Sequence, residues 1–544
     1  MKFTPRQADE IFESLVSNFQ QGKRDRAIQL AVKALNGGLD EPLVLVLAAE
    51  FYEQQGRSDE GLSLLKKAIE IAPDEPQVWF CLGTMQVRLG MSEDGLISLT
   101  HALKLQPDML PALISAAAVS YRIGQLTYSL SLNQRLIELE PDNAQAYAVV
   151  AAIYARRNNL AKARSFAEKA ILLQKNNFTA TLTLNRIDLL EGKTEQTLIR
   201  INNLLKQSKL NHDEQIAMLD LRADVLDKLN RTAEAFADYE LRNQLLRSKW
   251  LPRMRVHETE SEVDKAKRLV SCIPLLSAET WVTTTQYIET EALCEHVFIL
   301  SFPRSGTTLL EKALSSHSDV LTLEEVDHVS YFSSQWLKDI ESMRVMSQLT
   351  TEQIRHFQKY YWQKVKESLD TQLDGKTLID KLPLHTLSLP VIAKLFPNAK
   401  ILFALRDPRD VVLSCFRRRF QINPAMFELL DLHTCARFYH EVMNLADISR
   451  SLLPIKVLDV KHEDTVQNFK ENMQKVLNFI GLNWQKEMQN FTANISDDPR
   501  TPSDIQLKAG LNTDGLAQWK RYQNQLEPIV TILEPWVQRF GYTK

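Results

Sequence analysis

One interval constrains this chain more than any other feature: a spacing of 34 residues that recurs through its first half. Six turn residues keep this interval, namely Gly22, Gly56, Gly90, Gly124, Asn158 and Gly192. A small side chain stands five residues after each of the first five turns: Ala27, Gly61, Gly95, Ser129 and Ala163. Two helices can cross closely only where the side chains between them are small, so the interval predicts a stack of helical hairpins.

The segment 76–107 shows the repeat most fully and resembles the tetratricopeptide-repeat family. The residues that carry this resemblance are Trp79, Leu82, Gly83 and Pro107. A further turn at Asn230 follows Gly192 after 38 residues, so the array is expected to cover residues 1–247. The resemblance implies an all-α solenoid of about seven hairpins whose concave face binds a protein or peptide. Residues 248–291 show no repeat and are expected to form a connector.

From residue 296 the sequence changes to short apolar runs that alternate with amphipathic segments. The runs predict four strands, at residues 297–302, 376–382, 400–406 and 456–462. The amphipathic segments predict helices near residues 307–316, 352–369, 387–396, 408–418, 429–450 and 466–481. Runs that are apolar throughout indicate strands buried on both faces, and therefore a parallel sheet. Residues 292–544 are thus expected to form an α/β domain that binds its ligand beyond the carboxyl ends of the strands.

The first predicted strand leads into the sequence FPRSGTT, in which a tight loop precedes a helix. Such a loop presents backbone N–H groups and a helix N-terminus to an anion. The mononucleotide phosphate loop has a lysine after its last glycine, whereas here Thr307 follows Gly306. Arg304 stands at the start of the loop instead. The sequence therefore predicts a P-loop-like anion site that lacks the lysine for a γ-phosphate.

Polar residues also follow other predicted strands: Lys381 closes IDKLP, and Arg406 and Ser414 frame RDPRDVVLS. Two groups of phosphate ligands on separate strand ends suggest a ligand with two separated anionic groups. PRSGTT, DKLP and RDPRDVVLS together resemble the sulfotransferase family that uses 3′-phosphoadenosine 5′-phosphosulfate (PAPS). FPRSGTTL with the later EE pair is similar to tyrosylprotein sulfotransferases, and to bacterial sulfotransferases that carry N-terminal tetratricopeptide repeats.

The resemblance implies a role for each of these residues in holding PAPS. Around the 5′-phosphosulfate it places Arg304, Ser305, Gly306, Thr307 and Thr308. At the 3′-phosphate it places Arg406, Ser414 and Arg418. His462, in VKHED, stands where relatives have a tyrosine and is expected to stack on the adenine. No metal ion is expected.

The resemblance also implies a catalytic set. Glu325 is expected to act as general base on the acceptor hydroxyl, with the adjacent Glu324 as the alternative. Lys381 is expected to neutralise charge on the departing oxygen, next to Arg304. Ser503, in TPSDIQLKAGLN, is expected to open a late loop that closes over the nucleotide.

Composition excludes some partners. A net charge of −3 over 544 residues gives no electrostatic reason to expect nucleic acid. No run of about 18 apolar residues predicts a membrane span, and the charged N-terminal sequence is unlike a secretory signal. The five cysteines lack metal-ligand spacing. We expect reduced thiols in a cytoplasmic protein.

Functions of different classes stay open on this basis. The favoured one is a PAPS-dependent sulfotransferase whose repeats recruit a protein or peptide with a tyrosine-like hydroxyl, although small-molecule and saccharide acceptors fit the same motifs. A second is a kinase with a degenerate loop, which the missing lysine and the missing metal-binding acid disfavour. A third is a repeat scaffold whose α/β domain binds a nucleotide without turnover.

Overall fold

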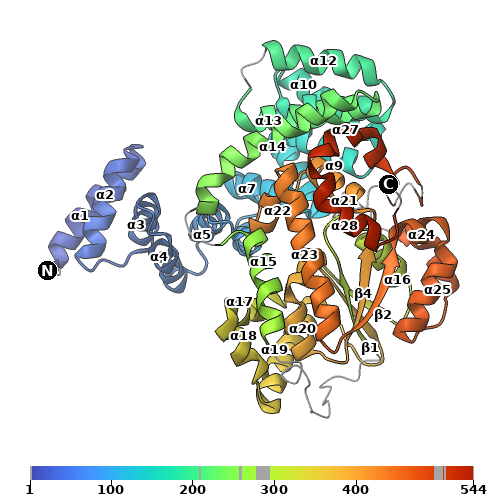
Figure 1. Ribbon diagram of the computed structural model, residues 1–544. Coiled ribbons are helices and arrows are strands. Elements are labelled where there is room, and N and C mark those ends of the chain that lie inside the picture. Colours follow the sequence, from blue (N-terminus) through green and yellow to red (C-terminus); the bar gives the residue numbers. More distant parts are fainter. Residues whose placement is uncertain are drawn as a thin grey trace. The chain divides into compact units, whose positions relative to one another are not determined.

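The computed structural model describes residues 3–207, 210–255, 260–276, 295–369, 371–494, 507, 510–511 and 513–542. These residues form two compact units, of which the first ends at Glu191 and the second begins at Gly192. The first unit is helical, and the second contains further helices and one sheet (Figure 1). No helix in the described part of the chain is long and apolar enough to cross a membrane.

The first unit is a succession of helical hairpins. Its helices are α1 (Pro5–Gln20), α2 (Arg24–Asn36), α3 (Pro42–Gln54), α4 (Ser58–Ile71), α5 (Pro76–Arg88), α6 (Ser92–Leu105), α7 (Leu110–Arg122), α8 (Leu126–Leu139), α9 (Ala144–Arg156), α10 (Leu160–Leu173) and α11 (Phe178–Leu190). The predicted turn residues have left-handed backbones, for example Gly90 with φ 89° and Asn158 with φ 59°. Glycine and asparagine adopt this conformation at low cost, which explains their place in the interval. The predicted helical array is confirmed.

The small residues of the repeat lie where helices cross. A Cβ atom added to Gly95 on α6 would stand 2.5 Å from Cγ2 of Val87 and 2.9 Å from the carbonyl oxygen of Gly83 on α5. Neither distance is possible for a real side chain. The close approach of α5 and α6 therefore requires glycine at this crossing.

The second unit opens with four more helices: α12 (Thr194–Gln207), α13 (His212–Lys228), α14 (Thr232–Arg255) and α15 (Glu262–Cys272). α14 continues past residue 247, where the array was expected to end. α15 and the short η1 (Ile273–Leu275) occupy the first part of the expected connector, and its last part lies outside the described residues. The last repeat-like hairpin, α13–α14, thus belongs to the same compact unit as the sheet.

The sheet has five parallel strands in the order β2-β3-β1-β4-β5. They are β1 (Glu295–Leu300), β2 (Val320–Glu324), β3 (Thr377–Lys381), β4 (Lys400–Leu405) and β5 (Lys456–Lys461). The parallel sheet and four of its strands were predicted. β2 was missed because it is a short edge strand, in which only Val320 and Leu323 are buried.

Helices cover both faces of this sheet (Figure 1). Phe298 and Leu300 of β1 belong to one core, with residues of α19, α20, α21 and α23, whereas Val297 and Ile299 belong to a second core with residues of α16 and α25. The helices of the domain are α16 (Thr307–Ser315), α17 (Ser330–Trp336), α18 (Ile340–Ser347), α19 (Thr351–Leu369), η3 (Pro383–Ser388), α20 (Leu389–Leu395), α21 (Pro408–Arg417), α22 (Pro424–Glu428), α23 (Leu432–Leu452), α24 (His462–Gln467), α25 (Phe469–Ile480), η4 (Lys486–Asn494), η5 (Gln518–Tyr522), α27 (Gln523–Leu526), η6 (Glu527–Ile529) and α28 (Val530–Arg539). The helices α17, α18, α22 and α28 and the short turns η4, η5, α27 and η6 were not predicted.

Candidate active site

The loop between β1 and α16 is held firmly at its base. The backbone N–H of Ser301 donates to the carbonyl oxygen of Pro383 at 3.1 Å, and the hydroxyl of Thr386 donates to the carbonyl oxygen of Ser301 at 2.9 Å. Two loop residues have left-handed backbones, Arg304 with φ 70° and Gly306 with φ 95°. Such conformations turn successive N–H groups toward one concave side of a loop. The first amides of a helix also lack acceptors within that helix, so the start of α16 suits an anion.

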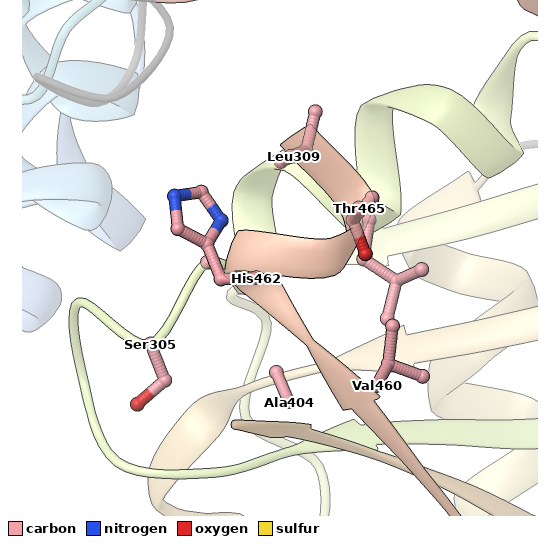
Figure 2. A pocket seen from close by; sticks show the side chains of 8 residues that line it. Ser305, Leu309, Ala404, Val460, His462 and Thr465 are labelled. Carbon is pink, nitrogen blue, oxygen red and sulfur yellow. The ribbon is translucent and has the colours of Figure 1, made fainter. Parts of the chain in front are cut away.

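Gly306 is required for a second reason. A Cβ atom at this position would stand 2.5 Å from Nδ1 of His462, which begins α24 at the end of β5. Figure 2 shows His462 at the start of α24 and Ser305 on the loop that lines the same small pocket. The lining residues are Ser305, Gly306, Leu309, Leu310, Ala404, Val460, His462 and Thr465. The predicted loop and His462 are therefore neighbours, although 156 positions separate Gly306 from His462 in the sequence.

Arg304, Arg406 and His462 form a cluster of basic side chains at this loop. Nε of Arg304 donates to the hydroxyl of Ser414 on α21 at 3.1 Å, and a guanidinium N–H of Arg406 donates to the carbonyl oxygen of Arg304 at 3.1 Å. Burial and the charges of Arg418 and Arg406 lower the pKa of Arg304 to about 9. Burial and the charges of Arg406 and Arg304 lower the pKa of His462 to about 3, so its ring is neutral at pH 7. The cluster concentrates positive charge that an anion would stabilise.

Two buried nitrogen atoms of the same cluster have no hydrogen-bond partner among the described residues. They are Nε of Arg406 and Nδ1 of His462. Buried polar atoms are rarely left without a partner in native proteins, because each costs desolvation energy. Together with the charge of the neighbouring arginines, they indicate a place for an anionic, polar ligand.

Lys381 and Glu325 form the second half of the site. Lys381 ends β3 with a fully buried side chain, and its Nζ lies 3.0 Å from Oε1 of Glu325 and 3.3 Å from Oε2 of Glu311 on α16. Burial alone would lower the pKa of Lys381, but the carboxylates of Glu311, Glu325 and Glu324 reverse that effect and raise it. Lys381 is therefore a cation at neutral pH, within reach of the half-exposed Glu325.

Glu325 and Glu324 differ in their surroundings. Oε2 of Glu324 pairs with Nζ of Lys312 at 2.8 Å, and the Glu324 side chain is only 11% exposed, against 47% for Glu325. Glu325 has a left-handed backbone with φ 56°, and its N–H donates to the carbonyl oxygen of Lys381 at 2.9 Å. A non-glycine residue in this conformation is strained and is typical of functional sites. The geometry favours Glu325 as the carboxylate that meets an acceptor.

The two halves of the site lie at the ends of adjacent strands, because Lys381 of β3 is paired with Ile299 of β1, the strand that leads into the loop. Thr307 and Thr308 are buried in the first turn of α16. Ser503 lies outside the described residues. Of the other predicted residues, the loop from Arg304, Glu325, Lys381, Arg406 and His462 lie at the carboxyl ends of the five strands, whereas Ser414 lies on α21 and Arg418 directly follows it.

Sequence reasoning missed Glu311. Its side chain is 1% exposed, and burial raises the pKa of its carboxyl group against the opposing charge of Lys381. The sequence held one sign that this glutamate is buried: it lies within LLEKAL, among apolar residues that face the core. A buried carboxylate needs a cationic partner, and only the fold shows that Lys381 is one, in addition to the neighbouring Lys312.

Comparison with known families agrees with this geometry. Residues 296–486 match the model described as "Sulfotransferase family", and residues 42–85 match the tetratricopeptide repeat. The chain thus combines a sulfotransferase-family domain with tetratricopeptide repeats.

Its relatives include protein-tyrosine sulfotransferases. The chain is 26% identical over 236 residues to the protein-tyrosine sulfotransferase of Drosophila melanogaster, covering 41% of this chain and 46% of that protein. It is 26% identical over 259 residues to protein-tyrosine sulfotransferase A of Caenorhabditis elegans, and this match covers 45% of this chain and 67% of that protein. An "Uncharacterized protein" of Aquifex aeolicus (strain VF5) is 25% identical over 247 residues, covering 44% of this chain and 32% of its own length. The chain thus spans less than half the length of the Drosophila and Aquifex relatives, and its relation to protein-tyrosine sulfotransferases is distant.

Solved structures with similar helical arrays include YrrB, described as a TPR protein with an unusual peptide-binding site. It is 22% identical, with a TM-score of 0.28, and the match covers 31% of this chain and 88% of YrrB. A tetratricopeptide repeat protein from Parabacteroides merdae ATCC 43184 is 14% identical, with a TM-score of 0.36, and the match covers 44% of this chain and 93% of that one.

Proposed function

We propose that this chain transfers a sulfuryl group from PAPS to a hydroxyl group of a protein or peptide. One observation carries the proposal: the Lys381–Glu325 pair, with Nζ and Oε1 at 3.0 Å, stands at the end of β3, and the neighbouring strand β1 leads into the loop of Arg304. An anion site without a catalytic pair would suit a binding protein, and the pair supplies both a base and a cation. The sulfotransferase family of the domain implies PAPS as the donor.

The residues present fit this donor. PAPS supplies a transferable sulfuryl group at its 5′ end and a further phosphate at its 3′ position. The amides of the loop at Ser305 and Gly306 would hold the 5′ end, with Arg304 beside them. Arg406, Ser414 and Arg418 would hold the 3′-phosphate, and the orphaned nitrogen of Arg406 would gain a partner there. The neutral ring of His462 suits a contact with the base.

Glu325 and Lys381 would have different roles in the reaction. Glu325, half exposed and held by Lys381, would take the proton of the acceptor hydroxyl, since a general base must lie within hydrogen-bond reach of the proton that it removes. Lys381 would stabilise the negative charge that develops on the oxygen between the sulfuryl group and the 5′-phosphate, as adenosine 3′,5′-bisphosphate departs. Buried Glu311 would hold Lys381 in place on the side away from the acceptor.

Two features support a protein or peptide as acceptor. The curated relatives carry the name protein-tyrosine sulfotransferase, and helical repeats of this kind commonly bind extended polypeptides. We also infer a reducing, cytosolic setting for the reaction. The cysteines in the described part of the chain, Cys81, Cys272, Cys415 and Cys435, are all free thiols, as proteins of that compartment have.

The donor assignment predicts a clear order of affinities by calorimetry. Adenosine 3′,5′-bisphosphate should bind the full chain at least about a hundredfold more tightly than ATP with Mg²⁺, because the loop lacks a lysine for a γ-phosphate. Arg406→Ala should weaken the bisphosphate by about tenfold or more and leave adenosine 5′-phosphate nearly unchanged. Arg419→Ala, which removes an exposed arginine of the same run, is the matched control. Tighter binding of ATP with Mg²⁺ would favour the kinase alternative.

The acceptor assignment predicts a labelled product. The full chain supplied with ³⁵S-labelled PAPS and a tyrosine-containing peptide library should give sulfated peptides, detected by a mass increase and by loss of label after sulfatase treatment. Label on small phenols or saccharides alone would reject the peptide acceptor and keep the enzyme class. Tight bisphosphate binding with no product from any acceptor class would favour the non-catalytic scaffold.

A further inference from the structure

A buried arginine of the repeat-like hairpin α13–α14 contacts the far end of the helix that carries Ser414. Arg242 on α14 is fully buried and donates to the carbonyl oxygens of Phe416 at 2.8 Å and Arg417 at 3.0 Å. The side-chain amide of Asn243 donates to the same Phe416 oxygen at 3.0 Å. These carbonyl groups end α21, where the last carbonyl oxygens of a helix have no N–H donor within the helix.

This contact is a helix cap supplied by a different part of the chain. The last carbonyls of a helix carry partial negative charge, which a nearby cation stabilises. A guanidinium suits two carbonyls at once, because its N–H groups form a planar fork. Arg242 is itself held by Asp220 on α13 and by the side-chain oxygen of Asn243, at 2.8 Å. The cap is therefore a built arrangement of buried polar groups and not a chance surface contact.

A second set of contacts joins the same hairpin to the C-terminal segment. The hydroxyl of Tyr522 donates to Asp227 on α13 at 2.6 Å, and Asp227 also pairs with Arg417. Phe236 of α14 stacks on Phe416 with ring centroids 5.0 Å apart. The hairpin thus grips both α21 and the segment around Tyr522.

Both gripped elements carry groups of the basic cluster. α21 holds Ser414, which accepts from Arg304, and Arg418 directly follows the helix. The segment before Tyr522 provides the carbonyl oxygen of Gly515, which accepts from Arg406. The hairpin therefore contacts the end of α21 and the segment around Tyr522, which are the two elements that contribute groups to the basic cluster.

We propose that Arg242 is a positioning residue: through the end of α21 it sets the place of Ser414 and Arg418, so that the last repeat-like hairpin forms part of the support for the 3′-phosphate site. This inference rests on the proposed function. It also makes the hairpin α13–α14 a functional part of the sulfotransferase-family domain, with which it already shares a compact unit.

The test uses the full chain with Arg242→Lys, which keeps the positive charge and loses the fork. The matched control is Arg222→Lys on α13, whose guanidinium pairs with Asp238 within the hairpin at 2.6 Å. The readout is the ratio of the dissociation constants of adenosine 5′-phosphate and adenosine 3′,5′-bisphosphate, measured by calorimetry. We expect the ratio to fall by about tenfold in R242K, through weaker binding of the bisphosphate alone, and to keep its wild-type value in R222K.

Other outcomes have separate meanings. A folded R242K with the wild-type ratio, or with equal losses for both nucleotides, overturns the positioning role, because a general loosening would not select the 3′ end. If R242K does not fold, Asn243→Ala removes the hydrogen bond to Phe416 and the side-chain oxygen that holds Arg242, and a wild-type ratio in that variant overturns the proposal. A wild-type protein that does not prefer the bisphosphate refutes the donor assignment first, and this inference with it.

Discussion

Replacing Glu325 with glutamine is expected to lower kcat by about 10²- to 10⁴-fold, the usual contribution of a general base. The amide keeps the size and the hydrogen-bonding reach of the side chain but cannot accept the proton of the acceptor. Binding of adenosine 3′,5′-bisphosphate should change by less than about twofold, because the basic cluster of Arg304 and Arg406 stays intact. Steady-state turnover with labelled PAPS, combined with calorimetry, measures both quantities.

Glu324→Gln is the matched comparison for this experiment. Glu324 pairs with Lys312 and is 11% exposed, so its amide should change kcat only slightly. A large loss in E324Q with normal turnover in E325Q would exchange the roles of the two carboxylates. Equal losses in both variants would show that the adjacent charges act together and that neither is the base by itself.

Replacing Lys381 with methionine is expected to have the largest effect on stability. Methionine fills a similar space but leaves the carboxylate of Glu311, which is 1% exposed, with only the more distant Lys312, whose Nζ lies 3.6 Å from Oε1. Breaking a buried pair in this way costs about 3–5 kcal/mol in the free energy of unfolding. Urea denaturation measures the loss, and turnover should fall to background in any fraction that stays folded, because the charge beside the departing oxygen is gone.

A double variant separates these two effects. Lys381→Met together with Glu311→Gln also removes the buried charge of Glu311, so most of the lost stability should return, while activity should stay at background. Return of activity along with stability would show that Lys381 serves only the fold. An unchanged free energy of unfolding in the single variant would contradict the buried pair itself.

The structure also indicates which N-terminal truncation would keep the contacts of α21. Removing residues 1–247, the expected array, would delete Arg242 and expose the carbonyl groups of Phe416 and Arg417 that it caps. The boundary between the compact units instead falls between Glu191 and Gly192 in the sequence. A shortened form intended to test the array alone should therefore keep α12 to α14.

Local patterns allowed much of this to be predicted from the sequence. A 34-residue interval of glycine and small residues specifies helix crossings without reference to distant parts of the chain. Apolar runs specify buried strands, and parallel strands bring their carboxyl ends to one edge. Arg304, Lys381 and Arg406 were identifiable because each follows such a run, inside a motif whose spacing is itself local.

Only the tertiary structure shows which groups, distant in the sequence, form a buried ion pair or a helix cap. Glu311 looks like one more acidic residue on a helix until the fold buries it against Lys381. Arg242 looks like part of a repeat until α14 places it at the end of α21, 174 positions away from Phe416. The edge strand β2 gave too weak a pattern, since an edge strand takes much of its order from its neighbour. Periodicity reports on the burial of a segment, whereas the pairing of buried charges depends on where separate segments meet.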